Sequence, residues 1–331
     1  MKKVLALLTI IVSLAACVND IPSTSDNGKN TIGIRLVTEA NPEWQYENLR
    51  IYPIVADPTV SDKHAALQKL KTLAEGMKTP GFRITELKQF GRTHEHRVNS
   101  LTVQNKSDKI IFLMSGDVVT GGNQDRVIAQ DQVVMPGTVK NIEVFCVEKG
   151  RWQFNDETAT ENEKNIYAFK SYYNVASPQV RQAVQRTGNQ NEVWNAVAKV
   201  TSANKVESST DAYAALETDN EAKAKREAYL RYFDGKTANL PNMIGMVVVC
   251  GDRVLGVDVF GHPDLFRRKY EALLHGYIAE AATEICTSKL VDDEVEKAFA
   301  DVARLVKPEA ASDDVAGKFA LSGAWVHLFK K

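Results

Sequence analysis

The fold is decided by IGMVVVCGDRVLGVDVF, residues 244–260. Two apolar runs, Ile244–Cys250 and Arg253–Phe260, flank Gly251 and Asp252, and this arrangement is typical of a β-hairpin with a tight turn. Helical periodicity precedes the hairpin, so the chain returns to strands late. We therefore expect the hairpin to rejoin a sheet that earlier strands have begun.

Upstream of the hairpin, short segments rich in branched and aromatic residues predict further strands, because turn residues bound each of them. Glycine and proline turns separate the later ones, which favours an antiparallel sheet. One helix is expected among them, capped by Ser61 or Asp62 and ended by Gly76. The predicted strands are Thr31–Val37, Leu49–Val55, Phe82–Phe90, Arg97–Val103, Lys109–Met114, Arg126–Gln130, Gln132–Met135 and Val139–Glu148.

Helical signals dominate the middle of the chain. Ser177 is placed as an N-cap with Pro178 at the first helical position, and apolar residues then recur at helical spacing over about 178–233. After the hairpin, His262-Pro263-Asp264 begins a long helix to about Cys286. A further helix is expected at Asp293–Leu305, and a last strand at Ala324–Phe329.

Strands and helices are thus segregated along the chain, which indicates an α+β fold, because a doubly wound fold would alternate them. The predicted architecture is a largely antiparallel sheet with a helical middle insertion and C-terminal helices. We expect one domain over residues 31–331, strand-rich in 31–155 and helix-rich in 156–331 apart from the strands at 244–260.

The composition is that of an ordinary globular protein. The chain has 331 residues, of which 44% are hydrophobic and 25% charged. The formal net charge is −1, so no overall field would hold the protein on nucleic acid, and we expect no nucleic-acid partner.

The N-terminus has the pattern of an export signal. Lys2 and Lys3 precede an apolar run, Val4–Leu14, that is too short to span a bilayer. The ending Leu14-Ala15-Ala16-Cys17 resembles the bacterial lipobox, in which the cysteine becomes the mature N-terminus and carries a diacylglycerol and an amide-linked acyl chain such as palmitate. Residues 1–16 are therefore interpreted as a lipoprotein signal peptide and Cys17 as the lipidation site. The alternative is an ordinary secretory signal with an incidental cysteine.

The resemblance also implies a compartment. Several acyl chains anchor a protein stably, so the partner expected at this end is a membrane. The residue after Cys17 is Val18 rather than Asp, which by analogy with enteric sorting favours the outer membrane. Residues 17–30 lack apolar periodicity and are predicted to be a flexible tether. The expected localisation is the bacterial cell envelope.

Two sequence elements carry a second resemblance: GDVVTGGNQDR, residues 116–126, and FCVEKGRW, residues 145–152. Together with GVDVFG at 256–261 they resemble the ARG and Rhodanese-Phosphatase-superfamily-associated Protein domain family, over about Thr31 to Cys286. The resemblance implies no reaction, because the family has no established activity, and its name records associations that are not chemistry.

The first element offers candidate ligand-binding groups. Gly121 and Gly122 permit close backbone approach, and Gln124, Asp125 and Arg126 add an amide, a carboxylate and a planar guanidinium. This set could hold a phosphate or a sugar. Alternatively it is a tight hairpin in which Arg126 pairs with Asp125 or Glu148 and the glutamine satisfies backbone groups.

The second element adds Glu148, Arg151 and Trp152 where a long strand turns. In a functional interpretation Glu148 is a general base or ligand acceptor, Arg151 binds an anion and Trp152 is a stacking wall. In a structural interpretation Trp152 covers the sheet edge, with Arg151 lying over its ring. The spacing does not separate the two.

Metal and cofactor signals are weak. His94 and His96 would share a face of a strand, but no third ligand follows from the sequence. We expect no metal and no cofactor. Two functions remain open: a module that binds a small ligand or an envelope protein, or a hydrolase or transferase acting on a nucleotide-like or phosphorylated molecule. The catalytic residues, if any, are not identified by the sequence.

Overall fold

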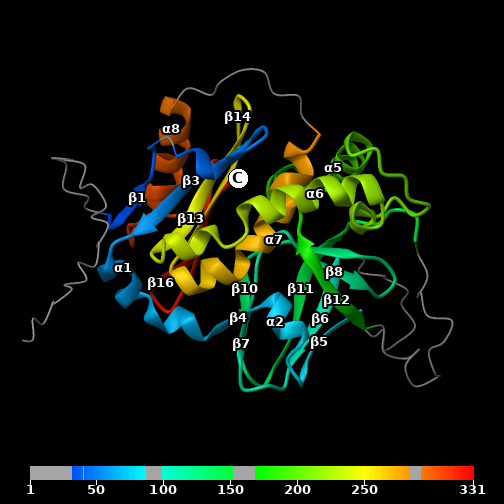
Figure 1. Cartoon of the computed structure of the whole chain (residues 1–331). Helices are drawn as coiled ribbons and strands as arrows, with labels where there is room; N and C mark the ends of the chain where they lie inside the picture. Colours follow the sequence, from blue (N-terminus) through cyan, green and yellow to red (C-terminus); the bar gives the residue numbers. More distant parts are fainter. Residues whose placement is uncertain (1–31, 40, 87–98, 152–167, 284–291) are drawn as a thin grey trace, which may run out of the picture. The chain divides into compact units, whose positions relative to one another are not determined.

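The computed structural model describes residues 32–39, 41–86, 99–151, 168–283 and 292–331. Residues Ile32–Lys331 form one compact unit (Figure 1). Its described strands make three sheets in which all pairings but one are antiparallel, and helices lie against them. The predicted α+β class is confirmed.

The largest sheet joins the two ends of this unit. Its strand order is β1-β3-β13-β14-β16-β15, with β2 added to β3. The predicted hairpin is confirmed as β13 and β14, and β13 also pairs with β3, so the late strands do rejoin the first ones. The strands are β1 (Ile34–Leu36), β2 (Gln45–Tyr46), β3 (Leu49–Ala56), β13 (Met243–Cys250), β14 (Arg253–Phe260), β15 (Ala316–Leu321) and β16 (Ala324–Lys330).

Helices cover both faces of this sheet, which explains the uninterrupted apolar run of β13. Met246 and Val248 pack with α7 (Pro263–Ala281), whereas Val247 and Val249 pack with α8 (Asp292–Ala303) (Figure 1). A strand buried on both faces needs apolar residues at every position rather than at alternate ones.

The strands between residues 70 and 175 form two smaller sheets. The six-stranded sheet has the order β12-β8-β9-β11-β6-β5, and a bridge from Thr85 to Ala168 connects its two edges. The three-stranded sheet has the order β10-β7-β4. The strands are β4 (Leu70–Thr72), β5 (Phe82–Glu86), β6 (Ser100–Asn105), β7 (Ile110–Leu113), β8 (Asp117–Gly121), β9 (Arg126–Ile128), β10 (Gln132–Val134), β11 (Thr138–Cys146) and β12 (Phe169–Val175).

The helical middle consists of α4 (Pro178–Thr187), α5 (Gln190–Ala203) and α6 (Asn220–Phe233). The Ser177 side chain accepts a hydrogen bond from the Val180 amide, which confirms the predicted N-cap. The His262 side chain likewise caps α7. Apolar residues of α4 and α5 share a buried cluster with residues of β8, β9 and β11.

The helix predicted between residues 61 and 76 is wrong. The chain instead forms α1 (Pro58–Lys63), a 3₁₀ turn (Ala65–Lys69), the strand β4 and the short helix α2 (Leu73–Met77). Strand β4 pairs in parallel with β7, and this pairing overrides the helical propensity of the local sequence. Strands β2, β8, β12 and β15 were not predicted either.

A chain of buried polar side chains links the largest sheet to α4 and to the segment before β10. Asp258 on β14 is fully buried and accepts hydrogen bonds from Tyr277 and from both terminal nitrogens of Arg181. His327 Nε2 lies 3.1 Å from Asp258 Oδ1, and its Nδ1 lies 2.7 Å from Asp131 Oδ2.

The chemistry of these partners fixes the protonation of His327. Both ring nitrogens face carboxylates, which only accept, so both nitrogens must carry protons. Burial alone would lower the pKa of His327, but the charges and hydrogen bonds of Asp131 and Asp258 outweigh it and raise the pKa. The Arg181 and His327 charges in turn hold the pKa of Asp258 below its ordinary value despite its burial. The four groups form two buried positive and two buried negative charges.

We predict that Arg181→Ala lowers the free energy of unfolding by about 3–5 kcal/mol, because it leaves the Asp258 carboxylate charged and short of partners inside the protein. Urea denaturation of wild type and variant measures the loss. The matched control is Arg231→Ala, which removes an exposed ion pair with Glu227 at 3.6 Å and should cost at most about 1 kcal/mol. Equal losses in the two variants would contradict the prediction.

Candidate functional site

The residues singled out by the sequence do come together, around the Arg151 guanidinium. Arg151 binds Glu148 through Nε, 2.8 Å from Oε1, and through Nη2, 2.6 Å from Oε2. Nη2 also lies 3.0 Å from Asp125 Oδ1, and Nη1 donates to the Gly122 carbonyl at 2.8 Å. One arginine therefore ties the turn at 121–125 to the end of β11.

A second set of bonds lies beneath the first. Gln124 Nε2 donates to the Glu148 carbonyl at 2.7 Å, so this side chain satisfies the backbone, as the structural interpretation expected. Arg126 does not pair with Asp125 or Glu148 through its charge. Its Nη2 lies 3.4 Å from Glu86 Oε1, a partner that the sequence analysis did not identify.

Two glycines make this packing possible. Gly121 and Gly122 have φ of +119° and +55°, a region that disfavours residues with a side chain. A Cβ on Gly122 would lie 2.7 Å from Glu86 Oε1 and 2.8 Å from a ring carbon of Phe169. The predicted close approach is therefore real, but it is an approach to the protein's own side chains.

The two carboxyl groups of the cluster have opposite electrostatic environments. Burial, and to a lesser degree the neighbouring Glu148 charge, raise the pKa of Asp125 to about 6. The hydrogen bond from the Gly121 amide and the charge of Arg151 lower this pKa but do not outweigh burial. Burial of Glu148 is outweighed by its hydrogen bonds with Arg151, Thr210 and the Asp125 amide, which lower its pKa. Asp125 therefore binds a proton at a higher pH than Glu148 does.

The cluster is buried rather than open. Gln124 and Arg126 are each 1% exposed, and Asp125 and Glu148 are 6% and 4% exposed. Their polar groups are mostly committed to one another, as the structural interpretation anticipated. Trp152, His94, His96 and Cys17 lie outside the described residues, so the structure does not test the roles expected of them.

The two described cysteines, Cys146 and Cys250, are buried and form no disulfide. Burial raises the pKa of Cys146 to about 11, which disfavours its reactive thiolate form. Within the described part of the chain no three His, Cys, Asp or Glu side chains group in a way that could hold a metal ion.

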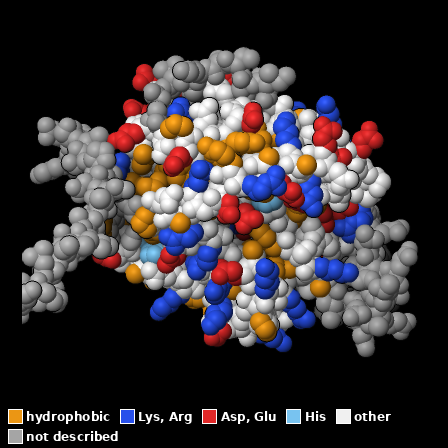
Figure 2. All heavy atoms as spheres, in the orientation of Figure 1, with side chains coloured by type: hydrophobic (Ala, Val, Ile, Leu, Met, Phe, Trp, Pro, Cys, Tyr) orange, Lys and Arg blue, Asp and Glu red, His pale blue; other side chains and the backbone are white. Residues whose placement is uncertain are grey.

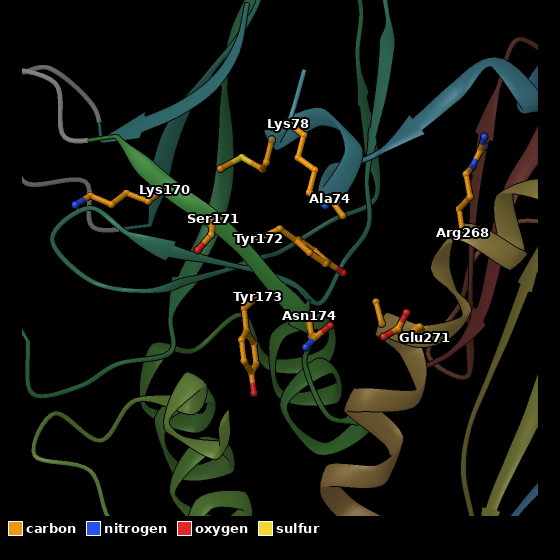
Figure 3. Close-up of a pocket in the computed structure, with 11 residues that line it drawn as sticks. Ala74, Lys78, Lys170, Ser171, Tyr172, Tyr173, Asn174, Arg268 and Glu271 are labelled. Carbon is orange, nitrogen blue, oxygen red and sulfur yellow. The ribbon is translucent and has the colours of Figure 1, made fainter. Parts of the chain in front are cut away.

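An open cavity lies elsewhere, beside the edge strand β12. It has a volume of about 410 Å³, within the range of small-molecule sites. Figure 3 shows Tyr172 and Asn174 on β12 near Ala74 of α2 and Glu271 of α7. The full lining comprises Ala74, Met77, Lys78, Lys170, Ser171, Tyr172, Tyr173, Asn174, Arg268, Glu271 and Ala272.

A buried ion pair holds one wall of this cavity. The Tyr172 hydroxyl donates to Asp117 Oδ1 at 3.0 Å, and the same oxygen accepts from the ammonium of Lys269, which is 1% exposed. Asp117 Oδ2 in turn accepts from the Met114 amide. Tyr172 cannot turn out of the wall without breaking its bond to a buried carboxylate.

Sequence reasoning missed this cavity for a physical reason. Its walls come from α2, β12 and α7, which are far apart in the sequence and meet only through tertiary packing. The only local signal is the segment Phe169–Val175, whose aromatic and β-branched residues favour a strand.

A comparison with protein families matches the ARG and Rhodanese-Phosphatase-superfamily-associated Protein domain over residues 38–323. Comparison with curated proteins and with solved structures gives no match. The matched range includes the turn at 121–126, Glu148 and Arg151, the hairpin of β13 and β14, and every residue that lines the cavity. The chain therefore belongs to the ARG and Rhodanese-Phosphatase-superfamily-associated Protein domain family.

Proposed function

We propose that this chain is a lipid-anchored protein of the bacterial cell envelope, at the outer membrane, whose body binds a small ligand. The observation that carries the binding role is the cavity of about 410 Å³ beside β12, with its mixed polar and apolar lining. The polar groups of the cluster around Arg151 already bind one another, so the cavity is the more suitable place for a ligand.

The anchor is proposed from the sequence. The apolar run Val4–Leu14 and the small residues before Cys17 have the order expected of a lipoprotein signal. None of the helices in the described ranges is long and apolar enough to cross a bilayer. A lipid on Cys17 would supply attachment through several acyl chains.

We predict that the full-length protein expressed in bacteria incorporates labelled palmitate and sediments with membranes, and that Cys17→Ser abolishes the label and releases the protein. The reason is that the thiol of Cys17 is the attachment atom for the diacylglycerol. Autoradiography and fractionation measure the two effects. Cys250→Ser is the control, since this thiol is buried in β13. Equal labelling of wild type and Cys17→Ser would refute the anchor.

The charge pattern of the surface agrees with a small-molecule role. Figure 2 shows Lys and Arg side chains interspersed with Asp and Glu over the face drawn. The formal charge of the whole chain is −1. Mixed charges of this kind favour solubility over attraction to a polyanion, so nucleic acid is not the partner we propose.

We predict that compounds binding the wild-type protein lose their binding when the cavity is filled. Asn174→Trp places a large ring in the cavity from a half-buried position of β12, and a thermal melt of the variant checks that it folds. A thermal-shift screen of a broad small-molecule library compares the two proteins. Asn195→Trp, at an exposed position of α5 away from the cavity, is the control. The proposed cavity function is wrong if every compound that stabilises the wild type also stabilises Asn174→Trp, or if no compound stabilises the wild type.

One observation favours a second candidate function, a hydrolase or transferase acting on a nucleotide-like or phosphorylated molecule. Asp125 has a pKa raised to about 6, beside Glu148 with a lowered pKa. Carboxyl pairs whose pKa values are pushed apart are typical of general acid and base assignments. Arg151, between them, would contact an anionic group only by leaving one carboxylate.

The raised pKa has a measurable consequence. Between pH 3.8, the ordinary pKa, and about pH 6, the folded protein binds a proton at Asp125 that the unfolded chain does not. The contribution of protonated Asp125 to the free energy of unfolding is therefore fully present below about pH 4 and is lost as the pH rises through 6. We predict that Asp125→Asn, which imitates the neutral acid, becomes more stable relative to wild type over this window, by roughly 3 kcal/mol at most.

Urea denaturation at a series of pH values measures this difference. Glu148→Gln is the matched control, because a lowered pKa gives the opposite sign: its ionised form stabilises the fold above about pH 4, and the variant should be less stable at neutral pH. A difference between Asp125→Asn and wild type that does not change with pH would remove the support for an acid at this position.

A further inference from the structure

We infer that the ligand of the cavity beside β12 is a small hydroxylated anion, such as a sugar that carries one carboxylate or phosphate group. This inference rests on the proposed binding function and adds the chemical class of the ligand. Three features of the cavity carry it: the balance of charge around it, the hydrogen-bonding groups opposite the charge, and the fixed aromatic wall.

The charge balance is positive. Lys78, Lys170 and Arg268 line the cavity, and Glu271 is the only acidic side chain in its lining as the structure describes it. Glu75 lies behind Arg268, 3.7 Å from Nε, but it also pairs with Lys71 at 3.1 Å. Even without Lys170, the three cations Lys71, Lys78 and Arg268 outnumber the two carboxylates Glu75 and Glu271, which favours an anion.

The cationic side chains of the cavity are not all equally able to bind an anionic ligand. Arg268 donates to the carbonyls of Gln68 and Leu70 at 3.3 and 2.9 Å, so its terminal nitrogens are occupied. Lys78 ends α2, is exposed, and carries three donors on a flexible stem. We therefore assign the anionic group of the ligand to the end of the cavity near Lys78.

The remaining polar groups suit hydroxyls. Asn174 offers both a donor and an acceptor, and Glu271 offers acceptors, whereas the Ser171 hydroxyl already bonds the Thr120 hydroxyl at 2.6 Å. Figure 3 shows Asn174 and Glu271 lying close together at the end of the cavity formed by α7. A carboxylate there would repel a second anionic group but accept hydrogen bonds from hydroxyls, so the ligand should carry its charge at one end only.

The wall between the two ends is aromatic and fixed. The Tyr172 ring is held by its bond to Asp117, and the Lys269 ammonium lies 5.5 Å from the ring centroid. Met77, Ala74 and Ala272 add apolar surface. A rigid apolar surface of this kind packs against the C–H groups of a sugar ring without losing side-chain entropy on binding.

Calorimetry on the full-length protein in detergent tests the inference with four probes: glucuronate, glucose 1-phosphate, methyl glucoside and inorganic phosphate. We expect the two sugar anions to bind at least about tenfold more tightly than methyl glucoside or phosphate. Their affinity should fall as salt is added, because the Lys78 contact is exposed. Whichever sugar anion binds more tightly identifies the charged group.

Single substitutions test which side chains contact the ligand. Lys78→Ala should weaken the sugar anions about tenfold and leave methyl glucoside unchanged, while Asn174→Ala should weaken all three sugars. Lys199→Ala, at an exposed position of α5 outside the cavity, should change nothing. Thermal melts of each variant confirm folding.

Several results would overturn the inference. Methyl glucoside binding as tightly as the sugar anions would exclude a role for charge, and phosphate binding as tightly as glucose 1-phosphate would exclude a role for the hydroxyls. If none of the four probes binds but Asn174→Trp abolishes the binding of library compounds, the ligand class is wrong and the proposed function stands. If Asn174→Trp abolishes no binding at all, the proposed function itself fails.

Discussion

The buried Asp258 carboxylate binds side chains from three other elements of this structure. It lies on β14 in the middle of the largest sheet and collects Arg181 from α4, Tyr277 from α7 and His327 from β16. A fully buried carboxylate is costly unless its charge is balanced and its lone pairs are filled. The helical middle, the last strand and the long helix must therefore all dock correctly before this sheet is stable, which makes the unit cooperative.

The cluster around Arg151 follows the same physical rule on a smaller scale. Asp125, Glu148 and Arg151 satisfy one another, and Arg126 reaches Glu86 on β5. Unlike the Asp258 network, this one has a carboxyl group whose pKa is raised to about 6. The cavity beside β12 differs from both, because it is open and its lining includes the side chains of Lys78, Asn174 and Glu271. This contrast is the reason for placing the ligand there.

The sequence predicts what depends on local pattern. The hairpin at 244–260 and the Ser177 cap follow from residues that are neighbours in the chain. The convergence of Asp125, Glu148 and Arg151 follows as well, because β9 and β11 lie close in sequence and pair. The segment of strand β4 was predicted to be helical, because only its pairing with β7 makes it a strand. The Arg126–Glu86 pair and the cavity depend on tertiary packing, which no local pattern contains.

The Asp258 network also affects how relatives of this chain should be compared. Loss of any one member leaves an uncompensated charge in the core, so acceptable changes at Arg181, Asp258 and His327 would have to occur together. Selection for folding alone would then keep these residues nearly invariant across the family. An invariant Asp-His-Arg set is easily taken for an active site, yet here it would record the assembly of the core. Variable positions around the cavity would be more informative about function, because they can change with the ligand while the fold persists.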